Sequence, residues 1–170
     1  MDQVHLHLLI NHLPIIGSLL GALVLAFGLW RKSEPTVVAA YGVLVLAALG
    51  AGVAQLTGEG AEQAVEHLPG VLESRIERHA EFAEYALVAL LTMGALALVG
   101  LVMSARRSAH SARMATLVLL AALVGFGLVG WTGYLGGQIR HTELTSGGAS
   151  GVASGGNEAG SATVTGGDND

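Results

Sequence analysis

The chain has 170 residues, of which 52% are hydrophobic and only 12% carry a charge, and its formal net charge is −5. This composition is too apolar for an ordinary soluble domain, and the negative charge gives no support to nucleic-acid binding. Because the chain contains no cysteine, disulfides, iron–sulfur clusters, thiolate-bound copper and covalent c-type haem are excluded.

Four apolar segments follow one another along the chain, and each approaches or exceeds the length of about 20 helical residues that crosses a membrane. These segments contain no Asp, Glu, Lys or Arg and cover residues 13–30, 37–56, 85–103 and 114–135. With their flanking turns they predict membrane spans at about 8–30, 36–57, 82–104 and 113–137. We therefore expect an all-α protein, an integral membrane four-helix bundle formed by residues 1–145.

The residues between and after these segments complete the predicted organisation. Pro14 either kinks the first helix or begins it, with Asn11 as the N-cap. The outer loop, residues 58–81, should be partly helical: residues 62–66 continue the second helix and an amphipathic run leads into the third. The Gly- and Ser-rich acidic tail, residues 146–170, is expected to be disordered because it offers little apolar area to bury.

Basic residues predict the orientation. Arg31 and Lys32 lie in the first link, and three arginines without an acid lie in and around the third link, whereas the second link is rich in glutamate. Lys and Arg are retained on the cytoplasmic side of membranes. The first and third links are therefore predicted to be cytoplasmic, which gives an N-out, C-out topology.

Six of the seven histidines gather at the predicted outer face of the bundle. They are His5, His7, His12, His67, His79 and His141, whereas His110 lies on the predicted cytoplasmic side. Because imidazole is the commonest neutral metal or haem ligand, this clustering indicates a bound cofactor.

Four of these histidines are the strongest candidate ligands. His12 stands at the edge of the apolar run, where it needs a polar partner. His7 and His79 continue small-residue faces of the first and third helices, and His141 follows a glycine stripe on the fourth. That stripe, which includes Gly130, Gly133 and Gly137, would allow the close approach of a flat macrocycle or, equally, ordinary packing of small residues between membrane helices.

Several motifs together resemble an uncharacterised family of small bacterial four-helix inner-membrane proteins. They are residues 5–14 (HLHLLINHLP), 56–62 (LTGEGAE), 67–71 (HLPGV), 76–79 (IERH) and 136–143 (GGQIRHTE). The resemblance covers about residues 5–143 and implies a multi-pass protein of the bacterial inner membrane, but it implies no activity. The general plan is also similar to that of membrane b-type cytochromes, which is an architectural likeness only.

The leading functional hypothesis is a membrane electron-transfer protein that binds haem b through histidines from facing helices. Its redox partner would be another protein or a quinone. One alternative is a copper, zinc or iron ion site with His and Glu ligands. Another is a cofactor-free structural subunit of a larger membrane complex or homo-oligomer. No hydrolase signature such as G-x-S-x-G or H-E-x-x-H is present, so an electron carrier or subunit is expected rather than a hydrolase or transferase.

Overall fold

The computed structural model describes residues 3–65 and 72–140. Its helices are α1 (Gln3–Ile10), α2 (His12–Arg31), α3 (Glu34–Val65), α4 (Glu73–Ala105) and α5 (Ser111–Arg140). All regular structure in this part of the chain is helical, which confirms the predicted all-α class. His67, His141 and the tail lie outside the described residues.

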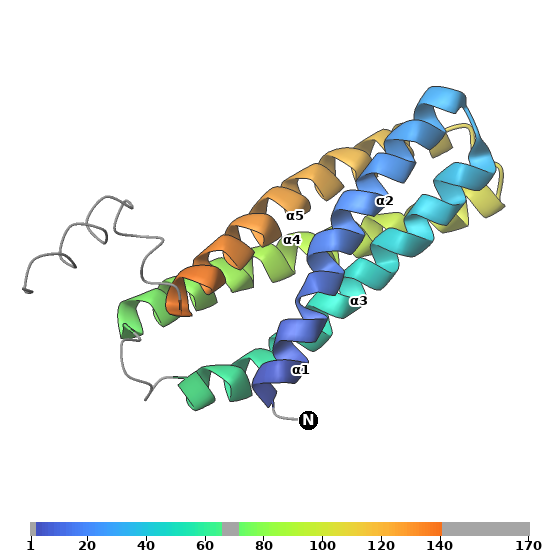
Figure 1. Cartoon of the computed structure of the whole chain (residues 1–170). Coiled ribbons are helices and arrows are strands. Elements are labelled where there is room, and N and C mark those ends of the chain that lie inside the picture. Colours follow the sequence, from blue (N-terminus) through green and yellow to red (C-terminus); the bar gives the residue numbers. More distant parts are fainter. Residues whose placement is uncertain (1–2, 66–71, 141–170) are drawn as a thin grey trace, which may run out of the picture.

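The long helices form a four-helix bundle, with α1 added at one end (Figure 1). Helix α2 packs against α3 and α5, and α4 packs against the same two neighbours. Helix α1 packs mainly against α3. The predicted continuation of the second helix is confirmed, since α3 runs beyond Gly58 and Gly60 to Val65.

Four helical stretches are long and apolar enough to cross a membrane, and they lie at His5–Arg31, Glu34–Gly58, Glu73–Ala105 and Ser111–Gln138. The first stretch combines α1 with α2. The bundle can therefore present four apolar crossings, as the hydropathy pattern predicted.

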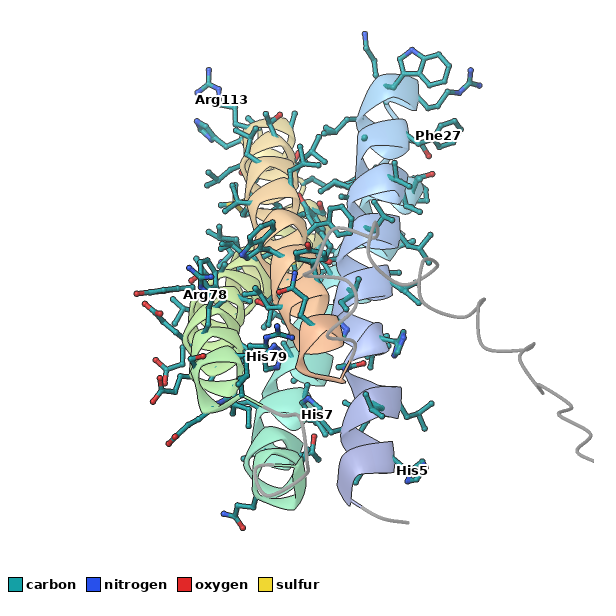
Figure 2. All side chains as sticks on the ribbon, turned by 60° about the vertical axis from the view of Figure 1, so that its left-hand side comes forward. His5, His7, Phe27, Arg78, His79 and Arg113 are labelled. Atoms are coloured by element: carbon teal, nitrogen blue, oxygen red, sulfur yellow. The ribbon has the colours of Figure 1, made fainter. Side chains whose placement is uncertain are left out.

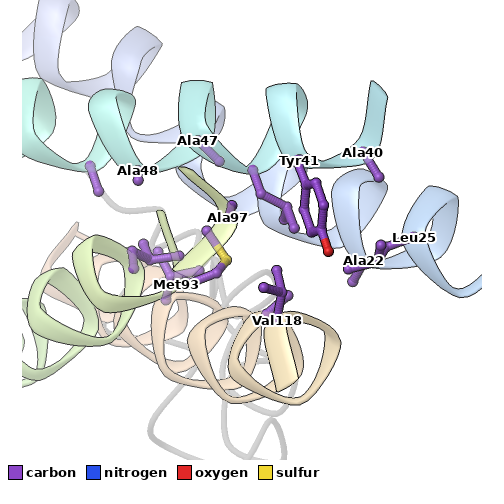
Figure 3. Close-up of a cluster of buried hydrophobic side chains, with 14 of the residues drawn as sticks. Ala22, Leu25, Ala40, Tyr41, Ala47, Ala48, Met93, Ala97 and Val118 are labelled. Atoms are coloured by element: carbon purple, nitrogen blue, oxygen red, sulfur yellow. The ribbon is translucent and has the colours of Figure 1, made fainter. Parts of the chain in front are cut away.

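The interior of the bundle is built mainly from small side chains, while large apolar side chains cover its outside. Figure 3 shows the buried centre, where alanines surround a few larger residues: Ala22, Ala40, Ala47, Ala48 and Ala97 with Leu25, Tyr41, Met93 and Val118. Exposed leucine, valine and phenylalanine side chains cover the outer faces of all four long helices. Small residues let membrane helices approach closely, so this distribution suits a bundle surrounded by lipid.

The junction between α1 and α2 differs in detail from the predicted cap. Asn11 occupies the N-cap position of α2, as predicted, but it has helical torsion angles (φ −63°, ψ −20°) and its side chain makes no capping hydrogen bond. Pro14 lies in the first turn of α2, where its missing N–H cannot donate to the carbonyl of Ile10 and its ring crowds that carbonyl. The helix is interrupted at Asn11, three residues before Pro14.

The two short links place the basic residues at one end of the bundle. Helix α2 ends in a left-handed Lys32 (φ 52°), with the N–H of Ser33 donating to the carbonyl of Gly28 at 2.9 Å. A second residue with left-handed backbone angles, Arg107, lies in the link that follows α4. In Figure 2, Arg113 marks this basic end, and His7 and His79 lie toward the other end.

Candidate functional site

His7 is held against α3 near the end of the bundle. Its Nδ1 lies 3.1 Å from the carbonyl oxygen of Ala54 and 3.2 Å from Oγ1 of Thr57. A carbonyl can only accept a hydrogen bond, so Nδ1 of His7 carries a proton, and in the neutral ring Nε2 is the nitrogen with the free lone pair. Gly58 lies beside the same ring. A Cβ added at this glycine would lie 3.6 Å from Cε1 of His7.

His79 is held in the same manner by the other pair of helices. It lies in α4, is half-buried, and its Nδ1 is 3.0 Å from the carbonyl oxygen of Thr132 in α5. The same reasoning places the proton on Nδ1 and leaves Nε2 available. A Cβ added at Gly136 would lie 3.1 Å from Cε1 of His79. The absence of a side chain at Gly136 therefore lets the ring pack against α5.

His7 belongs to α1 and His79 to α4, and both rings lie toward the same end of the bundle (Figure 2). Hydrogen bonding of one ring nitrogen to a main-chain carbonyl is how proteins orient imidazole ligands, because it sets the tautomer and the ring plane. Two of the four predicted ligands thus lie toward one end of the bundle, and a main-chain carbonyl orients each of them through Nδ1.

A buried polar atom accompanies this pair. Oδ1 of Asn11 is buried and has no hydrogen-bond donor among the residues that the structure describes. Asn11 lies one turn beyond His7, and its N–H donates to the carbonyl of His7 at 2.9 Å. Leaving such an acceptor without a donor costs about 1–3 kcal/mol. The site therefore contains a polar group suited to an additional donor.

His12 is placed on the outer surface instead. Its side chain is exposed, and Nδ1 lies 2.7 Å from the carbonyl oxygen of Leu8 in the preceding turn. The polar partner that the sequence predicted for His12 is thus its own backbone. His12 is five positions after His7, and this offset turns the two side chains to different faces.

The other histidines do not join the pair in the described structure. His5 and His110 are both exposed, and His110 lies near the basic end of the bundle. His67 and His141 are outside the described residues, so the predicted role of His141 stays a prediction. Within residues 3–65 and 72–140, no three or more His, Asp or Glu side chains are grouped so that they could hold a metal ion.

The predicted glycine stripe lies mostly on the outer side of α5. Gly133 and Gly137 are exposed and Gly130 is half-buried. A Cβ added at Gly130 or Gly137 would meet no atom within 4 Å, and one at Gly133 would meet only the tip of Ile15. The close approach to a histidine occurs at Gly136, which the sequence reasoning did not single out.

The signal for Gly136 was present but weak. The buried side of α5 passes through Val129, Thr132 and Leu135, at spacings of three residues, and Gly136 is four residues after Thr132. Neighbouring glycines obscured this face, since two faces of α5 are rich in small residues. Comparison with known protein families, known proteins and solved structures gave no match to this chain. The family resemblance described above therefore stays a prediction.

Proposed function

We propose that this is a multi-pass protein of the bacterial inner membrane that binds haem b between His7 and His79 and transfers electrons. The membrane placement is supported by four sufficiently long apolar helices and by large apolar side chains on the outside of the bundle. The proposed orientation puts the basic end in the cytoplasm and the histidine end outside.

The observation that carries the haem proposal is that a main-chain carbonyl orients both imidazoles in the same way. Each is bound through Nδ1 to a main-chain carbonyl, at 3.1 Å for His7 and 3.0 Å for His79, and both rings lie toward the same end of the bundle. Two imidazoles from different helices of a bundle are a donor set that suits haem iron. Haem bound there would supply a one-electron carrier, and the protein residues would orient the ligands and limit access of water.

A bare metal ion is the second candidate, and it needs more donors. Zinc sites in proteins are generally four-coordinate, with at least three protein ligands. His7 and His79 would supply two of these, and a third would have to come from beyond the described residues, for example His67 or His141. An ion site would leave the protein without the visible absorption of haem.

The test is the visible spectrum of the full-length protein purified in mild detergent from haem-replete cells. We expect a Soret band that shifts and sharpens on reduction. His7→Ala and His79→Ala should each abolish the low-spin spectrum, because each removes an axial ligand. His12→Ala and His110→Ala serve as matched controls and should leave it unchanged, since both side chains are exposed.

Three results would count against this proposal. A colourless protein that retains stoichiometric zinc, copper or iron would favour the ion site. A protein with neither haem nor metal would favour the cofactor-free subunit. A haem spectrum that survives both single substitutions, His7→Ala and His79→Ala, would move the ligands elsewhere.

A further inference from the structure

A second site lies at the same end of the bundle, on the outer side of the seam between α4 and α5. A pocket of about 320 Å³ is lined there by Ser74, Arg75, Arg78, Leu135 and Gln138. Among the residues that the structure describes, the lining offers two guanidiniums, a hydroxyl and an amide, without an acid. The glutamates of this part of α4, such as Glu77 and Glu81, are exposed and lie outside the lining. The chemistry of the pocket therefore favours an anion.

Arg75 fixes the shape of this pocket. Its Nη1 donates to the carbonyl oxygen of Gln138 at 2.6 Å, which ties the start of α4 to the last turns of α5. The last carbonyls of a helix have no partner within the helix, and a cation is favourable there. Arg78 lies three residues further along α4, so both guanidiniums serve the same pocket.

An aromatic cluster continues the seam toward the middle of the bundle. The ring centroids of Phe82 and Trp131 are 6.5 Å apart, those of Phe82 and Tyr85 6.1 Å, and those of Trp131 and Tyr134 5.4 Å. Trp131, Tyr85 and Tyr134 are at least half exposed. Tryptophan and tyrosine concentrate at the boundary between hydrocarbon and headgroups, so this cluster marks that level.

The spacing along the helices places the pocket at the depth of lipid phosphates. Arg78 precedes Phe82 by one turn, and Gln138 follows Tyr134 by one turn, so the polar lining lies about 6 Å beyond the aromatic level. The headgroup layer adds roughly 5–8 Å on each side of the hydrocarbon core. The guanidiniums are therefore at the height of the phosphates, with aromatic and aliphatic surface directly below them.

We propose that this pocket binds the phosphate of an anionic phospholipid, whose acyl chains lie along the aromatic seam. The guanidinium of Arg78 can bind phosphate oxygens through paired, charge-assisted hydrogen bonds, and Ser74 and Gln138 add neutral donors. The occupant is assigned as a lipid rather than a soluble anion because the exposed aromatic surface adjoins the pocket on its membrane side. This inference rests on the proposed membrane placement and is independent of haem.

The test is native mass spectrometry of the delipidated full-length protein in detergent, titrated with phosphatidylglycerol, phosphatidylcholine or inorganic phosphate. Phosphatidylglycerol should bind preferentially, and Arg78→Gln should weaken this binding at least about tenfold, as expected for the loss of a charged hydrogen bond. Arg113→Gln removes the same charge at the opposite end and should have no effect. Arg78→Lys should retain part of the binding.

Each alternative outcome overturns the proposal. Equal weakening by Arg78→Gln and Arg113→Gln would show a general charge effect, and no weakening would show that the pocket is not used. Equal binding of phosphatidylcholine would remove the preference for an anionic lipid, and equal binding of inorganic phosphate would make the ligand a soluble anion. Fractionation of the cells separates this from the larger proposal: a soluble chain would refute the membrane placement itself, whereas a membrane-embedded chain without lipid preference would refute only this site.

Discussion

The imidazole of His79 is positioned at two points by α5. Its Nδ1 is bound by the carbonyl of Thr132, and its Cε1 rests against the backbone at Gly136. A side chain at residue 136 would compete for the space of the ring without removing any donor. The geometry of this ligand can therefore be perturbed separately from its chemistry.

Gly136→Val should weaken haem binding, because the added side chain displaces the His79 ring. Overpacking of this kind costs about 1–3 kcal/mol, which corresponds to roughly 5- to 150-fold in affinity. Haem titration followed by absorbance measures the change. Gly137→Val is the matched control, since an added Cβ there meets no atom within 4 Å. Equal effects of the two variants would contradict the assigned role of Gly136.

The sequence allowed His7 and His79 to be predicted as candidates, but not their hydrogen bonds. Small residues repeat at helical spacing on the same faces, which indicates that both histidines turn inward. The partners at Ala54 and Thr132 are main-chain carbonyls, which any residue provides, so no sequence pattern marks them. For His12 the prediction failed. Its position beside an apolar run suggested a buried ligand, but it lies on a face of the helix that is exposed.

At the scale of helices, close packing depends on glycine at particular contacts. A Cβ added at Gly94 of α4 would lie 2.5 Å from Cβ of Ala48 in α3. An alanine side chain has no rotamer that could relieve this contact, so the helix backbones would have to separate. This contact limits the distance between α3 and α4 in the middle of the bundle.

Gly94→Ala should destabilise the bundle by about 1–3 kcal/mol, although alanine is intrinsically the better helix former by about 1 kcal/mol. Gly127→Ala adds the same methyl group to an open position and should be neutral or stabilising. Unfolding of both variants in detergent, followed by circular dichroism, gives the comparison. A Gly94→Ala protein as stable as the Gly127→Ala protein would contradict the packing described here.

The helices themselves were predicted well because their apolar lengths are unambiguous. The break between α1 and α2 was less predictable, since asparagine is a common N-cap residue but Asn11 has the backbone angles of a helix. Side-chain identity alone cannot show whether a helix restarts or merely bends before a proline. The inner face of α5 was similarly ambiguous, because Gly133 and Gly136 belong to different faces with nearly the same composition.

At the scale of the whole molecule, charge and histidine are separated along the bundle axis. Arg31 and Lys32 end α2 beside the link that holds Arg106 and Arg107, while His7 and His79 lie toward the other end. In the proposed orientation, with basic residues retained in the cytoplasm, the histidine pair would lie on the outer side. Electron exchange would then take place at the outer face of the membrane.

The orientation predicts which positions a membrane-impermeant thiol reagent can reach in intact spheroplasts. Cysteines introduced at Ser33 and Ser108 should be protected, and one at the exposed Glu73 should react. The chain has no native cysteine, so labelling reports only the introduced residue. Disruption of the membrane should expose all three positions. Protection of residue 73 together with labelling of residues 33 and 108 would reverse the topology.

The most direct test of the central claim, that His7 and His79 ligate one haem, is chemical rescue in the full-length protein. His79→Gly leaves the carbonyl of Thr132 and the space of the ring in place while removing the ligand. We expect this variant to lose the low-spin visible spectrum and to regain it when free imidazole is added, and His7→Gly should behave in the same way. If the spectrum of His79→Gly already matches the wild type without imidazole, His79 is not a ligand and the account of this site is wrong.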